Sequence, residues 1–163
     1  MSLASVLRRT AVATAVLGLT LTTASTATAA PKRPVVNAPV TVNLTVQGPA
    51  STLFSGSLST TGHDVTTASG GTHHCDGTNG GANTTPGATP TAALDDAAHT
   101  QGFTWDGTWY ASFDDYFVTS IASVPGGADA YWNISVNGTP IPVGGCQFRL
   151  NSGDKVAFTW TEL

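Results

Sequence analysis

A run of side chains near the middle of the chain has the types that bind transition metals: His73, His74, Cys75 and Asp76. Adjacent residues rarely point toward one centre, and no second Cys-x-x-Cys or His-x-x-x-His pair completes a zinc shell. If Cys75 is oxidised, its thiolate is not available to a metal. We therefore predict no metal site and no cofactor, and we keep His73 and His74 as candidate ligand contacts.

Acidic pairs offer a second kind of chemistry. Asp95-Asp96 and Asp114-Asp115 each place two carboxylates together, and a glycosidase uses two carboxylates as acid and nucleophile. Adjacent carboxylates in a helix or a loop are more often solvated, however, and no Gly-x-Ser-x-Gly motif supports a Ser-His-Asp hydrolase. The sequence thus predicts no catalytic residue, and we expect a protein that is not an enzyme.

Aromatic side chains are the more suggestive group. Trp109 and Tyr110 are bracketed by small residues, so we expect this pair at the surface. Exposed Trp and Tyr rings form platforms for sugars, corrin rings or partner proteins. The alternative is that these rings close the core of a small domain. We predict five ligand-binding residues: Trp109, Tyr110, Trp132, His73 and His74.

The start of the chain is typical of an export signal. Arg8-Arg9 precedes an apolar run over 11–21, and Ala27-Thr28-Ala29 fits the small-x-small cleavage pattern. The run is shorter than the about 20 apolar residues of a membrane-spanning helix, and general secretion and twin-arginine export both fit it. We expect a secreted, extracellular protein with three parts: a signal peptide over 1–29, a Pro-rich linker over 30–38 and one domain over 39–163.

The charge of the chain limits the classes of partner that it can bind, and its two cysteines predict a disulfide. After removal of the signal, ten acidic residues face four basic ones: Lys32, Arg33, Arg149 and Lys155. Because nucleic acids and anionic membranes are bound through Lys and Arg, neither partner is expected. In an exported chain the two cysteines favour a Cys75–Cys146 disulfide over a thiol nucleophile or metal ligands. In the chain-entropy model, such a disulfide stabilises the fold by about 4 kcal/mol.

The elements that position these residues are strands and one helix. Residues 40–46 alternate apolar and polar side chains, and 52–59 and 63–67 follow as returning strands. Residues 68–90 are rich in Gly, Thr, Asn and Pro, which predicts a long surface loop tethered by Cys75. A helix begins after the N-cap Thr89 and ends at Gly102, with Leu94 and alanines toward the sheet and Asp95-Asp96 near solvent.

The second half of the sequence predicts a cluster of short strands. The strand candidates are 103–105, 116–121, 131–136, 147–150 and 156–160, with a turn at 107–110. Two further turns are expected, a type I′ turn at Asn137-Gly138 and another at Gly153-Asp154. The predicted fold class is α+β: a β-grasp-like mixed sheet crossed by one short helix, with a long disulfide-tethered loop.

The sequence resembles the transcobalamin-like C-terminal domain, a bacterial secreted domain in the soluble-ligand-binding β-grasp group. Two motifs carry the resemblance most specifically: Tyr131-Trp132-x-x-x-Val136-Asn137-Gly138 and Leu150-x-x-Gly153-Asp154-x-Val156. Weaker support comes from three segments: Val42-x-Leu44-x-Val46, the helix over 92–98, and 116–121. The resemblance implies a β-grasp domain of the kind that packs over cobalamin held by a separate helical barrel, and it supplies no catalytic residues.

These observations predict a monomeric, non-catalytic binding module. The first hypothesis is capture of a small soluble ligand, cobalamin-like or carbohydrate, near Trp109 and the loop over 70–85. The alternative is an extracellular protein-interaction or cell-surface module that uses sheet edges.

Overall fold

The structure is a computed structural model that describes residues 36–163. The predicted signal peptide (1–29), and the predicted linker up to residue 35, lie outside the described residues. Ten strands are present in the described range: β1 (Val40–Gln47), β2 (Thr52–Thr60), β3 (His63–Thr67), β4 (Gly71–Cys75), β5 (Trp105–Tyr110), β6 (Asp115–Ile121), β7 (Val124–Pro125), β8 (Ala130–Val136), β9 (Thr139–Pro140) and β10 (Lys155–Glu162). The helices are α1 (Pro90–Gln101) and the 3-10 turn η1 (Asn79–Gly81).

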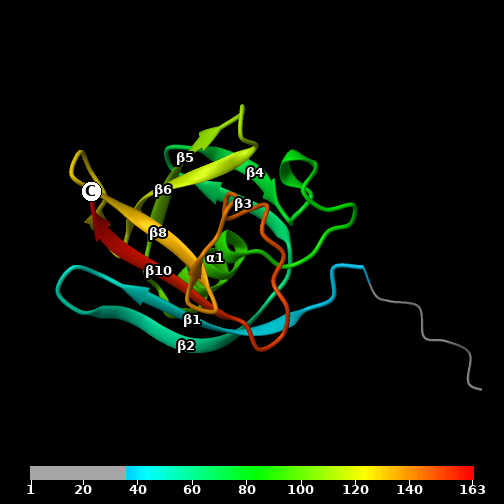
Figure 1. Ribbon diagram of the computed structural model, residues 1–163, viewed down its shortest axis with the longest axis horizontal. Helices are drawn as coiled ribbons and strands as arrows, with labels where there is room; N and C mark the ends of the chain where they lie inside the picture. The colour runs from blue at the N-terminus through cyan, green and yellow to red at the C-terminus, as the bar shows by residue number, and fades with distance from the viewer. Residues whose placement is uncertain (1–35) are drawn as a thin grey trace, which may run out of the picture. The chain divides into compact units, whose positions relative to one another are not determined.

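The main sheet has the strand order β2-β1-β10-β8-β9. β1 and β10 pair in parallel, whereas the other neighbours pair antiparallel (Figure 1). The first and last strands of the domain therefore lie side by side in the middle of one sheet. This arrangement is sheet-rich and α+β, as the sequence predicts.

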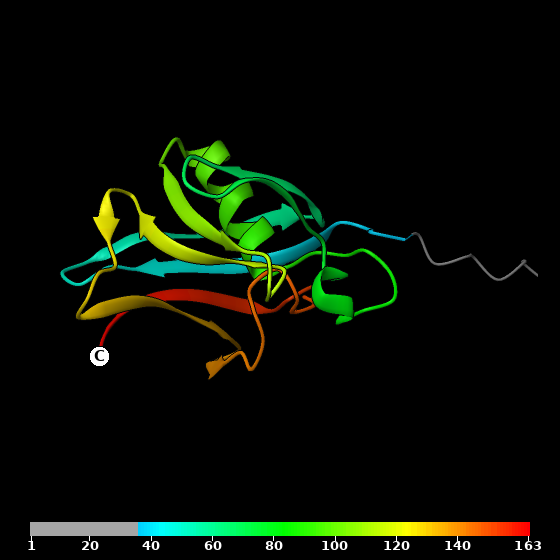
Figure 2. The ribbon, with the colours of Figure 1, turned by 90° about the horizontal axis from the view of Figure 1, so that it is seen from above.

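Alternation along β1 and β10 buries one face of this sheet. Val42, Leu44 and Val46 of β1 and Phe158 of β10 are buried in one core with Leu94 of α1. In Figure 2 the helix lies on one side of β1 and β10, together with the two smaller sheets, β3-β4 and β5-β6-β7. Burial of these apolar side chains is the main stabilising contribution to the domain.

The helix begins and ends where the sequence predicts. The Thr89 hydroxyl accepts a hydrogen bond from the Ala92 N–H at 3.2 Å, and Pro90 occupies the first helical turn. At the other end Gly102 has a φ of 75°, and its N–H donates to the Ala98 carbonyl. Because a left-handed φ favours glycine, this residue stops the helix.

Two of the motif turns are joined to each other by hydrogen bonds. Asn137 and Gly138 have φ values of 54° and 81°, as a type I′ turn requires. Asn137 Nδ2 donates to Asp154 Oδ1 at 2.9 Å, and the Lys155 N–H donates to Asn137 Oδ1 at 3.0 Å. The β8–β9 turn and the start of β10 are thereby held in register.

The expected disulfide is confirmed. Cys75, at the end of β4, is bonded to Cys146, 71 residues later, with the two Cα atoms 4.5 Å apart. Both cysteines are fully buried, in a small cluster with Val65 and Tyr116. The bond ties the β3–β4 hairpin to the segment between β9 and β10.

Three expectations about the elements are wrong. Residues 68–90 are not one surface loop, because β4 pairs with β3 and residues 88–90 are buried. Residues 147–150 form no strand: the N–H groups of Gln147 and Phe148 both donate to the Gly144 carbonyl, which makes turns. Residues 107–110 are not a turn but part of β5, which pairs with β6.

No helix within residues 36–163 combines the length and apolar character needed to cross a membrane.

Candidate functional site

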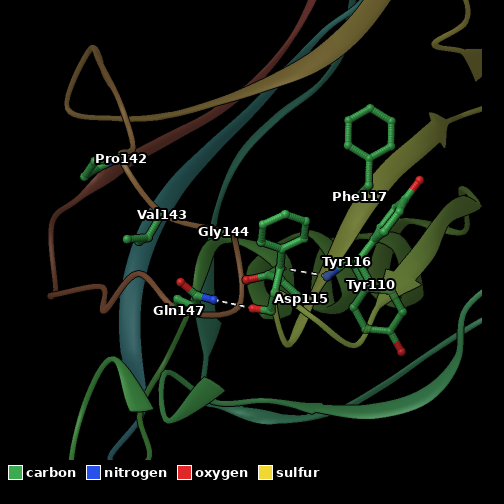
Figure 3. A pocket seen from close by; sticks show the side chains of 9 residues that line it. Tyr110, Asp115, Tyr116, Phe117, Pro142, Val143, Gly144 and Gln147 are labelled. Carbon is green, nitrogen blue, oxygen red and sulfur yellow. Dashed lines mark hydrogen bonds between the residues drawn. The ribbon is translucent and has the colours of Figure 1, made fainter. Parts of the chain in front are cut away.

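A cavity of about 550 Å³ lies beside the end of β5 and the start of β6, where a turn joins the two strands (Figure 3). Its walls come from these two strands, the turn between them, and the segment after β9. The lining residues are Tyr110, Phe113, Asp115, Tyr116, Phe117, Pro142, Val143, Gly144 and Gln147. Most of these side chains are apolar, which is typical of a site for a small molecule.

Large apolar side chains remain exposed at this place. Tyr110 is 47% exposed, Phe113 68%, Phe117 51% and Val143 42%. The Tyr110 ring centre lies 6.5 Å from those of Phe113 and of Phe117. Because a cluster of exposed apolar side chains is costly in water, such a patch marks a binding surface.

The pairing of β5 with β6 decides which rings reach the cavity. Tyr110 is opposite Asp115, and Thr108 is opposite Phe117. Since side chains alternate along a strand, Tyr110, Asp115 and Phe117 share one face of this hairpin. Trp109 projects from the other face, and so does the Tyr116 ring, which packs against Trp109 and His73 although Tyr116 also borders the cavity.

Asp115 lies at the base of the cavity and is buried, with 5% of its surface exposed. Its Oδ1 accepts from the Tyr116 N–H at 2.8 Å, and its Oδ2 accepts from the Cys146 N–H at 3.0 Å. Burial raises the pKa of Asp115 to about 7, against the lowering effect of the Cys146 and Tyr116 N–H groups. The expectation that this carboxylate is solvated is therefore wrong.

The segment after β9 closes one side of the cavity. Gln147 Nε2 donates to the Phe113 carbonyl at 2.6 Å (Figure 3). A Cβ on Gly144 would overlap the Asp115 carboxylate, so only glycine allows this close approach. Because Cys146 is in this segment, the disulfide holds the wall against the β5–β6 hairpin.

The structure separates the five residues predicted to bind ligand. Tyr110 lines the cavity. His73 stacks on Trp109, with ring centres 3.9 Å apart, on the opposite face of the hairpin, and His74 Nε2 lies 3.6 Å from Asp114 Oδ2. Trp132 is 4% exposed and belongs to the main core, where its Nε1 donates to the Val124 carbonyl.

Sequence reasoning missed Phe117, Phe113 and Val143. Alternation along 115–117 is a signal that pairs Phe117 with Asp115 on one face. No comparable signal exists for Val143. It lines the cavity because the segment after β9, which the Cys75–Cys146 disulfide holds, passes beside the β5–β6 hairpin.

A second polar cluster lies at the start of β3 and on α1. Asp95 is 5% exposed, not solvated as expected, because its carboxylate accepts from Trp105 Nε1 at 2.9 Å and lies 3.3 Å from His63 Nε2. Burial works to raise the pKa of Asp95, but the hydrogen bonds from His63 and Trp105 outweigh it and lower that pKa. The Asp95 hydrogen bond in turn raises the pKa of His63. Within residues 36–163 no three His, Cys, Asp or Glu side chains are grouped to hold a metal ion.

Comparison with protein families gives one match. A family model described as a domain of unknown function (DUF4430) matches residues 93–162. This part of the chain contains most of α1 and strands β5 to β10, including every residue that lines the cavity. No curated protein matches the chain.

Among solved structures, the chain is similar to part of haptocorrin, a transcobalamin-family protein solved in complex with Cbi. The two are 13% identical with a TM-score of 0.52, and the match covers 78% of this chain but 26% of the haptocorrin chain. At this identity the likeness shows a shared fold alone. A protein from Ruminococcus gnavus ATCC 29149, provisionally named a metal binding protein, is 12% identical over 76% of this chain and 98% of its own, but a TM-score of 0.42 carries no argument.

Proposed function

We propose that this chain is a secreted, non-catalytic module that captures a small soluble ligand in the cavity beside β5 and β6. The observation that carries the proposal is the group of exposed aromatic side chains, Tyr110, Phe113 and Phe117, around an apolar cavity of about 550 Å³. This volume lies in the range of small-molecule sites, roughly 300–1,000 Å³.

The fold supports a relation to the transcobalamin-like C-terminal domain. A β1–β2 hairpin, a crossing helix and a parallel β1–β10 pair are the features expected of a β-grasp domain. Haptocorrin was solved with Cbi, so corrinoids are one ligand class to test here. Carbohydrates are the other, because flat apolar sugar faces stack on aromatic rings.

The predicted residues take different parts in this proposal. Tyr110 contacts the ligand, whereas Trp109 and His73 support the β5–β6 hairpin from its other face and His74 lies beside Asp114 of the connecting turn. Trp132 stabilises the main core. Placement outside the cell is supported by the Cys75–Cys146 disulfide, because such bonds persist in oxidising compartments.

Isothermal titration calorimetry with cobalamin, cobinamide and a panel of sugars tests the proposal. Saturable binding that is lost in Tyr110→Ala and Phe117→Ala, and kept in Val36→Ala, is expected. Val36 is a suitable control because it is also an exposed apolar residue, 62% exposed, and does not line the cavity. Binding that survives both cavity variants would refute the assignment of this site.

A second candidate function rests on strand β2. β2 is a nine-residue strand at the edge of the main sheet. Edge strands leave N–H and C=O groups that can pair with an extended peptide of a partner protein. In that case hydrogen exchange of the β2 amides slows when the partner binds, while the amides around the cavity are unchanged.

A further inference from the structure

The cavity contains a buried acid that has no basic side chain beside it. The two hydrogen bonds described above tie the Asp115 carboxylate to main-chain N–H groups of Tyr116 and Cys146. None of the nine lining residues is Lys, Arg or His. Arg149 and Lys155 are the Lys and Arg residues within 36–163, and neither lines the cavity.

The groups around Asp115 donate hydrogen bonds to the carboxylate but include no positively charged side chain. Asp114 precedes it and adds a second negative charge, which works in the same direction as burial. His74, on β4, is directed to Asp114 rather than to Asp115, with Nε2 and Oδ2 3.6 Å apart. From the segment after β9, Gln147 and Cys146 contribute uncharged groups. A cation placed in the cavity would therefore be the first positive charge close to Asp115.

The rest of the cavity also suits a cation. Tyr110, Phe113 and Phe117 are exposed around it, and aromatic ring faces attract ammonium groups. Gln147 Nε2 is already used by the Phe113 carbonyl, which leaves the amide oxygen of Gln147 as an acceptor. The charged group at the cavity is thus an acceptor, the Asp115 carboxylate, and it matches a ligand that carries a positive charge and donates.

We infer that the cavity selects small organic cations, in which an ammonium group meets Asp115 and an apolar body lies against Tyr110, Phe113 and Phe117. The inference rests on the proposed function and deepens it, because it names the charge of the ligand. The cavity disfavours anions, since a carboxylate or phosphate would lie close to the Asp115 carboxylate with no Lys, Arg or His side chain in the lining to offset the repulsion.

The inference predicts a specific pH dependence of ligand affinity, because binding of a cation is coupled to loss of a proton from Asp115. Burial holds the pKa of Asp115 near 7, so part of the carboxyl is protonated at neutral pH. A bound cation favours the ionised form and displaces that proton. Affinity for a cation therefore rises as the pH increases from 5 to 8, whereas affinity for a neutral ligand of the same shape does not.

The test compares 2-phenylethylammonium with 2-phenylethanol, which have nearly the same shape but differ in charge. Calorimetric titrations of the protein at pH 5 and pH 8 measure both affinities. At pH 8 we expect the cation to bind at least about tenfold more tightly, the size of one charge-assisted hydrogen bond. At pH 5 this preference should be largely lost.

Two variants assign the effect to the acid. Asp115→Asn should reduce the cation to the affinity of the alcohol at both pH values and leave the alcohol unchanged. Asp129→Asn removes the same charge from an exposed position outside the cavity, and it should keep the full preference. If Asp115→Asn does not fold, the pH dependence of the unsubstituted protein still decides the matter.

The outcomes separate this inference from the proposed function. Equal affinity of the two compounds, with both lost in Phe117→Ala, overturns the cation preference and keeps the binding site. No binding of either compound, together with no binding of any corrinoid or sugar, overturns both. A free amine and a lysine side chain share this chemistry, so a blocked Lys-Phe dipeptide is titrated in parallel: tighter binding of the dipeptide identifies a peptide source, and weaker binding a free amine.

Discussion

At the scale of single residues, Asp115 and Gly144 show how closely the cavity depends on local contacts. The acid is buried because the segment after β9 lies directly over it, and that segment approaches only because residue 144 has no side chain. Two main-chain N–H groups hold the carboxylate in place. The position thus combines a buried carboxyl of raised pKa with a close backbone approach that tolerates little change.

We expect the pH dependence of stability to reflect Asp115. Its pKa is raised from 3.8 to about 7 in the folded state, so the folded protein binds one more proton than the unfolded chain between these values. The free energy of unfolding should therefore fall as pH rises from 4 to 7, by about 4 kcal/mol at most. Urea unfolding at several pH values measures this slope, and Asp115→Asn should remove it.

Some pH dependence will remain in that variant. The raised pKa of His63 adds stability that is present below pH 6.5 and is lost as pH rises through its folded value. The lowered pKa of Asp95 adds stability that is present above 3.8 and is lost as pH falls through its folded value. An unchanged slope in Asp115→Asn would show that Asp115 does not titrate as described.

Gly144→Ala should destabilise the domain by about 1–3 kcal/mol, because the new methyl group overlaps the Asp115 carboxylate. Gly127→Ala is the matched control, since a Cβ at that glycine meets no atom within 4 Å. Chemical denaturation of both variants measures the difference. Equal stability of the two would mean that the segment after β9 is free to move away from Asp115.

At the scale of elements, α1 connects the main sheet to the smaller ones. It packs on β1, β2 and β3, and its Leu94 is fully buried. Leu94→Ala should cost about 2–5 kcal/mol because it removes apolar contacts and leaves a cavity. Gln101→Ala, at the exposed end of the same helix, should change stability by less than about 0.5 kcal/mol. Thermal or urea unfolding compares them, and similar losses would contradict the packing of this helix.

At the scale of the whole domain, the disulfide connects stability with the cavity. It joins β4 to the segment that carries Val143, Gly144 and Gln147, which line the cavity. Replacing both cysteines by serine should lower the free energy of unfolding by about 4 kcal/mol, the value for closing a long loop. The same variant should bind ligand less tightly than the parent even under conditions where it is fully folded. Unfolding curves and titrations on one sample measure both effects, and unaltered affinity would show that the wall keeps its place without the bond.

Local patterns determined much of the architecture. Alternation over 40–46 and 131–136 predicted β1 and β8, and Thr89, Pro90 and Gly102 predicted both ends of the helix. These signals are readable because a strand period, a cap and a left-handed glycine depend on neighbouring residues only. The disulfide was predicted for a related reason: the chain has two cysteines, so there is one pairing to consider.

Tertiary contacts alone decided the rest. The sequence predicts a loop at β4 because Gly71–Cys75 has no apolar alternation, but this segment forms a strand through pairing with β3 and burial of Cys75. Asp95 and Asp115 look solvated in sequence, yet Trp105 covers one and the segment after β9 covers the other. Burial depends on residues distant in the chain, so neither the raised pKa of Asp115 nor the cavity that it shares with Phe117 could be predicted from local spacing.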